Sequence, residues 1–139
     1  MLRPSLRSLV RSAAGSTVRG VTRWAASVAA IGPLDPPARR YGAFGDGTSV
    51  CYPTGSQYGE RWIHLGSNTL IAAHVTLSAG MTPDQDMVTN PVVRIGDRCL
   101  IGRGTAIVGH FHIDIGDDVF TGMNVYITDQ NHVYEDLDT

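Results

Sequence analysis

Apolar residues return at every sixth position through the C-terminal half of the chain. One series is Ile95, Ile101, Ile107 and Ile113, and a second follows after a slip of two residues: Ile115, Thr121, Ile127 and Val133. A period of six fits neither the 3.6-residue turn of an α-helix nor a long two-residue alternation. It fits a β-helix, in which a short strand and a turn make each side of a coil. The pattern therefore predicts an all-β solenoid.

Each predicted coil opens with an apolar residue followed by glycine. The openings are Phe44-Gly45, Leu65-Gly66, Ile95-Gly96 and Ile115-Gly116. Three six-residue sides make 18 residues, so the spacings of 21, 30 and 20 residues equal one coil plus insertions of 3, 12 and 2. The 12-residue excess falls around residues 80–91, whose Gly, Pro, Asn and Asp content predicts a loop.

The first 31 residues follow a helical pattern and contain no Asp or Glu. Arginines recur four apart, opposite an apolar stripe: Arg3, Arg7, Arg11, Arg19 and Arg23. This predicts a basic amphipathic helix, interrupted near Gly15 and Ser16. The apolar runs are too short to span a bilayer, and arginines interrupt the region that a secretory signal needs continuously apolar. Three interpretations stay open: packing on the solenoid or a neighbouring subunit, peripheral contact with a membrane surface, and an organelle transit peptide.

These patterns divide the chain into three parts. Residues 1–31 form the helical segment, residues 32–43 a proline-rich linker, and residues 44–139 the β-helix domain. The chain ends at Asp138-Thr139 without a capping signal, a few residues after the last six-residue side. Because a solenoid needs its terminal coil covered, we expect a C-terminal portion to be missing.

Charge and cysteine content narrow the possible functions. Residues 1–40 carry seven Arg and one Asp, whereas residues 41–139 carry four Arg and twelve acidic residues. An acidic body argues against nucleic acid as a partner, because phosphate contacts need clustered cations. Cys51 and Cys99 match neither a zinc-finger spacing nor a disulfide framework. Cys99 takes the fifth position of its six-residue side, where we expect a small side chain inside the coil.

The last coil and the segment after it, IDIGDDVFTGMNVYITDQNHVYED, resemble the hexapeptide-repeat acyltransferases, the superfamily of maltose, galactoside and serine O-acetyltransferases. The resemblance covers about residues 44–139. It implies a left-handed parallel β-helix, a homotrimer with active sites between subunits, and transfer of an acetyl or other acyl group from acyl-CoA to a hydroxyl. The acceptor implied is a sugar or cell-envelope glycan. The location implied is the cytoplasm, with contact at the inner membrane face if residues 1–31 bind lipid, and no metal is expected.

Carried over by position, the resemblance implies that His132 is the catalytic residue. A neutral imidazole accepts the proton of the attacking hydroxyl and then protonates the departing thiolate. Candidates to hold its other nitrogen are Asp129, Glu135 and Asp136. Asn131 breaks the fifth-position pattern just before His132, which also marks this segment as unusual. From the spacing alone, the alternative interpretation is that Gln130, Asn131 and His132 belong to a polar loop that leaves the last coil.

Further candidates for substrate binding surround this segment. They are His110, Asn124, Tyr126, Asp129, Asn131 and Glu135. His110 and His112 are two apart on a predicted strand and should project to the same side. His74 is expected to face solvent or a subunit contact. Many relatives carry a second histidine at the place of Gln130 and an acceptor-binding asparagine near Gly104, so neither role is transferred.

Two other functions remain as alternatives. A γ-carbonic-anhydrase-like hydratase would gather three histidines around a metal at a trimer interface, and His110, His112 and His132 are numerous enough. A noncatalytic β-helix scaffold is the other alternative. The acidic TDQNHVYED segment favours the transferases.

Overall fold

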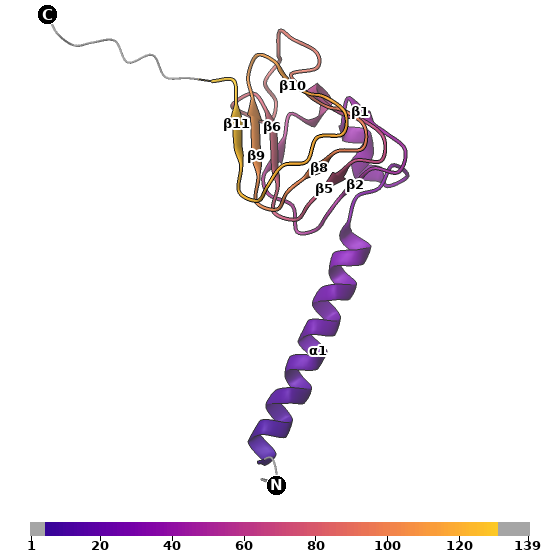
Figure 1. Ribbon diagram of the computed structural model, residues 1–139, viewed down its shortest axis with the longest axis vertical. Helices are drawn as coiled ribbons and strands as arrows, with labels where there is room; N and C mark the ends of the chain where they lie inside the picture. The colour runs from indigo at the N-terminus through magenta and orange to yellow at the C-terminus, as the bar shows by residue number, and fades with distance from the viewer. Residues whose placement is uncertain (1–4, 131–139) are drawn as a thin grey trace, which may run out of the picture.

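The six-residue period produces three parallel sheets around one apolar core. In the computed structural model, which describes residues 5–130, the sheet orders are β1-β4-β7-β10, β11-β9-β6-β3 and β2-β5-β8 (Figure 1). The strands are β1 Ala43–Phe44, β2 Ser49–Val50, β3 Gln57–Tyr58, β4 Ile63–Leu65, β5 Leu70–Ile71, β6 Thr76–Ala79, β7 Val93–Ile95, β8 Leu100–Ile101, β9 Ala106–Gly109, β10 Ile113–Ile115 and β11 Tyr126–Thr128. The fold is a parallel β-helix, as the repeat predicted.

The strand register confirms the predicted coil openings. Phe44 pairs with Leu65, Leu65 with Ile95, and Ile95 with Ile115. The inward residues of the three sheets stack in columns and are fully or nearly fully buried; examples are Leu65, Ile71, Leu77, Ile95, Ile101 and Ile107. The coils therefore contribute apolar side chains from all three sheets to a continuous core.

The turns repeat as regularly as the strands. The turn before the β2-β5-β8 sheet has a left-handed residue in every coil: Gly47, Asn68, Arg98 and Asp118, with φ of 71°, 55°, 55° and 59°. The turn after that sheet has a left-handed residue in the second, third and fourth coils: His74, Gly104 and Asn124, at 62°, 72° and 56°. All of these residues except Arg98 are Gly, Asn, Asp or His, the types that adopt this backbone region most readily, so local preference and coil geometry agree.

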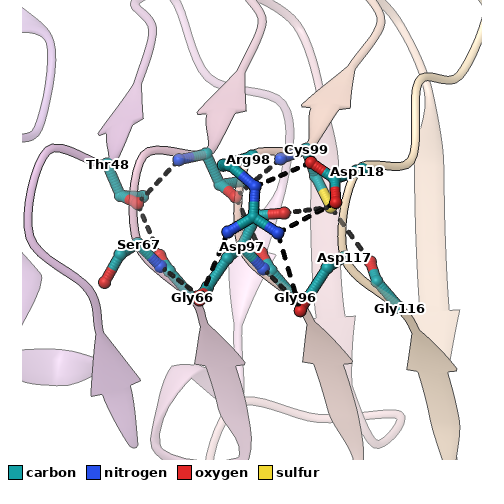
Figure 2. A network of polar contacts seen from close by, with 11 residues as sticks. Thr48, Gly66, Ser67, Gly96, Asp97, Arg98, Cys99, Gly116, Asp117 and Asp118 are labelled. Atoms are coloured by element: carbon teal, nitrogen blue, oxygen red, sulfur yellow. Dashed lines mark hydrogen bonds and ion pairs between the residues drawn. The ribbon is translucent and has the colours of Figure 1, made fainter.

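Hydrogen bonds between coils reinforce the first of these turns (Figure 2). Inside it, the Thr69 hydroxyl donates to the Gly96 carbonyl at 2.7 Å, and the Cys99 thiol donates to the Gly116 carbonyl at 3.1 Å. Outside it, the backbone N–H of Asp97 donates to the Asp117 carboxylate at 2.8 Å. Cys99 is 2% exposed, which confirms its predicted place inside the coil.

An ion pair joins the third and fourth coils at the same turn. Arg98 donates to both carboxylate oxygens of Asp118, at 2.7 and 2.8 Å. The hydrogen bonds from Arg98 lower the pKa of the Asp118 carboxyl. Both side chains are more than half exposed, so solvent screens the pair.

The N-terminal helix α1 spans Leu6–Ala29 without a break, so the predicted interruption near Gly15 was wrong. One glycine costs an exposed helix only about 1 kcal/mol, and the neighbouring Arg19 side chain covers this position and donates to Ser16. The helix extends away from the solenoid, and none of its residues is buried (Figure 1). It therefore does not pack on its own solenoid. No helix within residues 5–130 is long and apolar enough to cross a bilayer.

The proline-rich segment closes the first coil instead of remaining a free linker. It contains the 3₁₀-helix η1, Pro36–Arg40, in which Ala38 is buried. Tyr41 follows and donates its hydroxyl to the side-chain oxygen of Gln57 at 2.8 Å. Burial raises the pKa of Tyr41 far above its usual value. This segment covers the core at the N-terminal end of the β-helix.

The long insertion between β6 and β7 is a loop, as predicted. It folds back on the 3₁₀-helix η2, Glu60–Trp62. Arg61 forms an ion pair with Asp86, and the Trp62 indole N–H donates to the Gln85 carbonyl at 3.3 Å. These contacts hold the loop against the second coil.

Candidate functional site

The best-defined polar feature near the predicted active site is the carboxylate of Asp129. Asp129 follows β11 and accepts three backbone N–H groups from the coil before it. His110 donates to Oδ1 at 2.8 Å, while Phe111 and His112 donate to Oδ2, each at 2.7 Å. Hydrogen bonds to a carboxylate are roughly twice as strong as neutral ones. Asp129 therefore clamps the end of the last described strand to the corner formed by residues 110–112.

This clamp changes the conformation predicted for the GHFH stretch. The sequence suggested one strand with both imidazoles on the same side, but β9 ends at Gly109 and residues 110–112 form a bend. A strand points successive N–H groups in opposite directions, whereas here three consecutive N–H groups converge on one side chain. The predicted strand at His110 and His112 was therefore wrong.

The two histidines have different surroundings. The His110 ring packs edge-on against Phe111, with centroids 4.8 Å apart, and its Nδ1 is buried without a hydrogen-bond partner among residues 5–130. His112 is exposed, and its Nδ1 lies 3.1 Å from the Pro91 carbonyl oxygen. A buried ring nitrogen normally has a hydrogen-bond partner. The buried Nδ1 of His110 therefore makes His110, rather than His112, the stronger candidate for a functional residue.

Asn124 and Tyr126 lie at the opposite end of β11 from the clamp. Asn124 occupies the left-handed position of its turn, and Tyr126 begins the strand with 66% of its surface exposed. Three residues of strand separate Tyr126 from Asp129, a distance of about 10 Å. The structure thus joins His110 to Asp129 and places Asn124 and Tyr126 at the other end of β11.

The predicted residues Asn131, His132 and Glu135 lie outside the described residues. The described chain reaches Gln130, whose backbone N–H donates to the Thr128 hydroxyl at 3.1 Å. Gly104, where relatives carry an asparagine, lies in the turn after β8. Its φ is 72°, and a Cβ there would run into the side-chain oxygen of Asn124.

The sequence interpretation missed the structural role of Asp129 and the part played by the Phe111 and His112 amides. A signal was present, because Asp129 stands one 20-residue coil after Gly109, at the corner where the strand must end. A carboxylate at such a corner is a natural acceptor for converging N–H groups.

Two clefts among residues 5–130 lie away from the predicted site residues. One, of about 350 Å³, is lined by Tyr41 and Gln57, and the other, of about 290 Å³, by Arg61 and Asp84. Within residues 5–130, no three His, Cys, Asp or Glu side chains gather as metal ligands.

Comparison with known proteins identifies the repeat. Residues 92–129 match a family described as the hexapeptide repeat of succinyl-transferase. Over 77 residues, 55% of the chain, the sequence is 30% identical to a probable acetyltransferase of Mycobacterium tuberculosis. The match spans 21% of that relative, so the chain covers about a fifth of its length. No solved structure matches significantly.

Proposed function

Because residues 92–129 match the hexapeptide repeat of succinyl-transferase and the chain is similar to a probable acetyltransferase, we propose that it transfers an acetyl or other acyl group from acyl-CoA to a hydroxyl of a sugar or cell-envelope acceptor. The acyl-CoA is a co-substrate. His132 is the general base. The proposed acceptor site comprises His110, Asn124, Tyr126, Asp129, Asn131 and Glu135.

The observation that supports this proposal is the Asp129 clamp. A general base must be held within hydrogen-bond reach of the proton it removes. Asp129 fixes the end of β11 to residues 110–112, three residues before His132 in the sequence. The segment that carries His132 therefore starts from a rigid point of the solenoid. Asp129 acts here as a positioning residue.

The reaction proceeds by direct transfer. The acceptor hydroxyl attacks the thioester carbonyl while the neutral imidazole of His132 takes its proton. The tetrahedral intermediate then collapses, the carbon–sulfur bond breaks, and the imidazolium gives the proton to the departing thiolate. Proton transfer by a positioned side chain contributes typically about 10²–10⁴-fold to the rate. The products are the acyl ester and free coenzyme A.

The test is thiol release from acetyl-CoA and longer acyl-CoA donors, screened against sugar and glycan acceptors. We expect His132→Asn to lower turnover by about 10²–10⁴-fold, because it removes the proton acceptor. His74→Asn is the matched control. His74 is exposed at φ 62°, a backbone region that asparagine tolerates well. Turnover should be unchanged in this control.

Two results would contradict the proposal. One is full thiol release by His132→Asn with an acceptor that supports the wild-type reaction. The other is stoichiometric zinc or iron whose removal abolishes activity, which would favour the hydratase interpretation.

We also propose a homotrimer in the cytoplasm, where acyl-CoA is available, with donor and acceptor meeting between subunits. The outer face of the β2-β5-β8 sheet supports a subunit contact because Leu70, Leu100 and Phe120 expose 40%, 38% and 74% of their surfaces there. Analytical ultracentrifugation should give three times the mass of the chain. A fully active monomer would contradict this part.

A further inference from the structure

We infer that α1 docks lengthwise on an anionic lipid surface, through an apolar face flanked by arginines. The apolar face consists of Leu6, Val10, Ala13, Val21, Trp24 and Val28. This inference is independent of the proposed acyl transfer, because it rests on the helix alone.

The apolar face has no partner within the described chain. No residue of α1 is buried, and the exposed fractions of Leu6, Val21 and Trp24 are 79%, 56% and 65%. The helix has 24 residues and is therefore about 36 Å long. Few soluble proteins leave so long a row of large apolar side chains uncovered without an interaction partner.

The spacing of the apolar face fits a flat surface and a partner helix equally. An eleven-residue repeat relates Val10 to Val21 and Ala13 to Trp24, but Thr17 interrupts it between Leu6 and Val28. A seven-residue repeat relates Ala14 to Val21 and Val21 to Val28. The charges of the helix therefore have to decide between the two partners.

The charges select an anionic surface. Arg7, Arg11, Arg19 and Arg23 lie on or beside the polar face, and α1 contains no acidic residue. A second copy of the same helix would bring like charges together. Arg39 and Arg40, exposed in η1 just after the helix, add two cations at the same end of the molecule. Trp24 also suits a lipid interface, because its ring is apolar and its N–H is polar.

Docking of α1 has a consequence for the solenoid. The helix ends at Ala29, and Ile31 already pairs with Val50 of the first coil. The tether is thus a single residue, Ala30, and the first coil is held beside the lipid surface. An amphiphilic or membrane-bound acceptor could reach the protein from that surface.

The experiment measures binding of the full chain to vesicles by sedimentation at low salt. Vesicles of phosphatidylglycerol and phosphatidylcholine in equal parts should bind the protein, and vesicles of phosphatidylcholine alone should bind it far less. Trp24 fluorescence should shift to the blue on binding. Each arginine near an anionic surface strengthens binding about fivefold, so Arg19→Gln with Arg23→Gln should weaken it about 30-fold.

The matched control compares vesicle binding by two variants that each lose one arginine, one in α1 and one in the solenoid. Arg23→Gln should weaken binding about fivefold. Arg103 is exposed in the turn after β8, in the third coil of the solenoid. Arg103→Gln should leave vesicle binding unchanged. Equal loss in both variants would overturn the inference, as would equal binding to both kinds of vesicle or to neither. A blue shift of Trp24 that depends on protein concentration without lipid would identify a second copy as the partner and would also overturn it.

Discussion

The helix α1 and the β-helix obtain their stability from different sources. Each coil of the β-helix adds buried side chains to a core that its neighbours share, and residues such as Ile101 and Ile107 are completely buried. The helix has 24 residues and no buried side chain. The comparison teaches that folding free energy resides in the stacked coils, whereas the helix retains its apolar face for an interaction.

The largest expected effect comes from truncating the core. Ile101→Ala should lower the free energy of unfolding by about 2–5 kcal/mol, because Ile101 is completely buried in the middle of the stack. Val21→Ala, on the exposed face of α1, should change it by less than about 0.5 kcal/mol. Urea unfolding followed by tryptophan fluorescence measures both. Equal losses would show that α1 folds as part of the same core.

The second effect concerns the Asp129 clamp. Asp129→Asn should lower the free energy of unfolding by about 1–3 kcal/mol, because an amide has one acceptor oxygen for three converging N–H groups. Asp114→Asn, which breaks a half-exposed ion pair with Arg94 at 2.9 Å, is the control and should cost under about 1 kcal/mol. Hydrogen exchange should quicken at the amides of residues 110–112 in Asp129→Asn alone. Unchanged exchange there would contradict the clamp.

The third prediction is that replacing a glycine by alanine destabilises the solenoid but stabilises α1. Gly104→Ala should destabilise the solenoid by at least about 1–2 kcal/mol, because φ is 72° and the new Cβ would meet Asn124. Gly20→Ala in α1 should stabilise the helix by about 0.5–1 kcal/mol, because open space surrounds that position. Thermal melts followed by circular dichroism distinguish the two changes. Destabilisation by Gly20→Ala would reveal a covered helix face.

The smallest effect is the pH dependence of the Arg98–Asp118 pair. The folded pKa of Asp118 lies below its unfolded value because Arg98 donates hydrogen bonds to it. The pair therefore stabilises the protein fully above the unfolded pKa near 3.8, and this contribution is lost as pH falls through the folded pKa. Asp118→Asn should remove a small part of the acid dependence of stability, measured by urea unfolding from neutral to acidic pH. A larger acid dependence in this variant would contradict the sign.

Several features could be predicted because they depend on local repetition. The six-residue period gave the coil openings, and the register of Leu65, Ile95 and Ile115 confirms them. Loop composition located the insertion before β7. The conformation of residues 110–112 was missed because it depends on a carboxylate 17–19 residues away, whose place one coil later was the only signal for it. The continuity of α1 through Gly15 was mispredicted for a simpler reason: one unfavourable residue does not outweigh the turns on either side.

By itself, the sequence determined the solenoid, its coil frame, the basic amphipathic helix and the resemblance that points to His132. A six-residue repeat carries this information because every coil must bury the same positions. Only the tertiary structure decided that α1 stands away from the coils, that the proline-rich segment covers the first coil, and that Asp129 gathers the amides of residues 110–112. The repeat fixes which residues lie in neighbouring coils, but it does not fix which side-chain and backbone groups at a corner or at the end of the stack form hydrogen bonds or become buried, and contact geometry in three dimensions decides this.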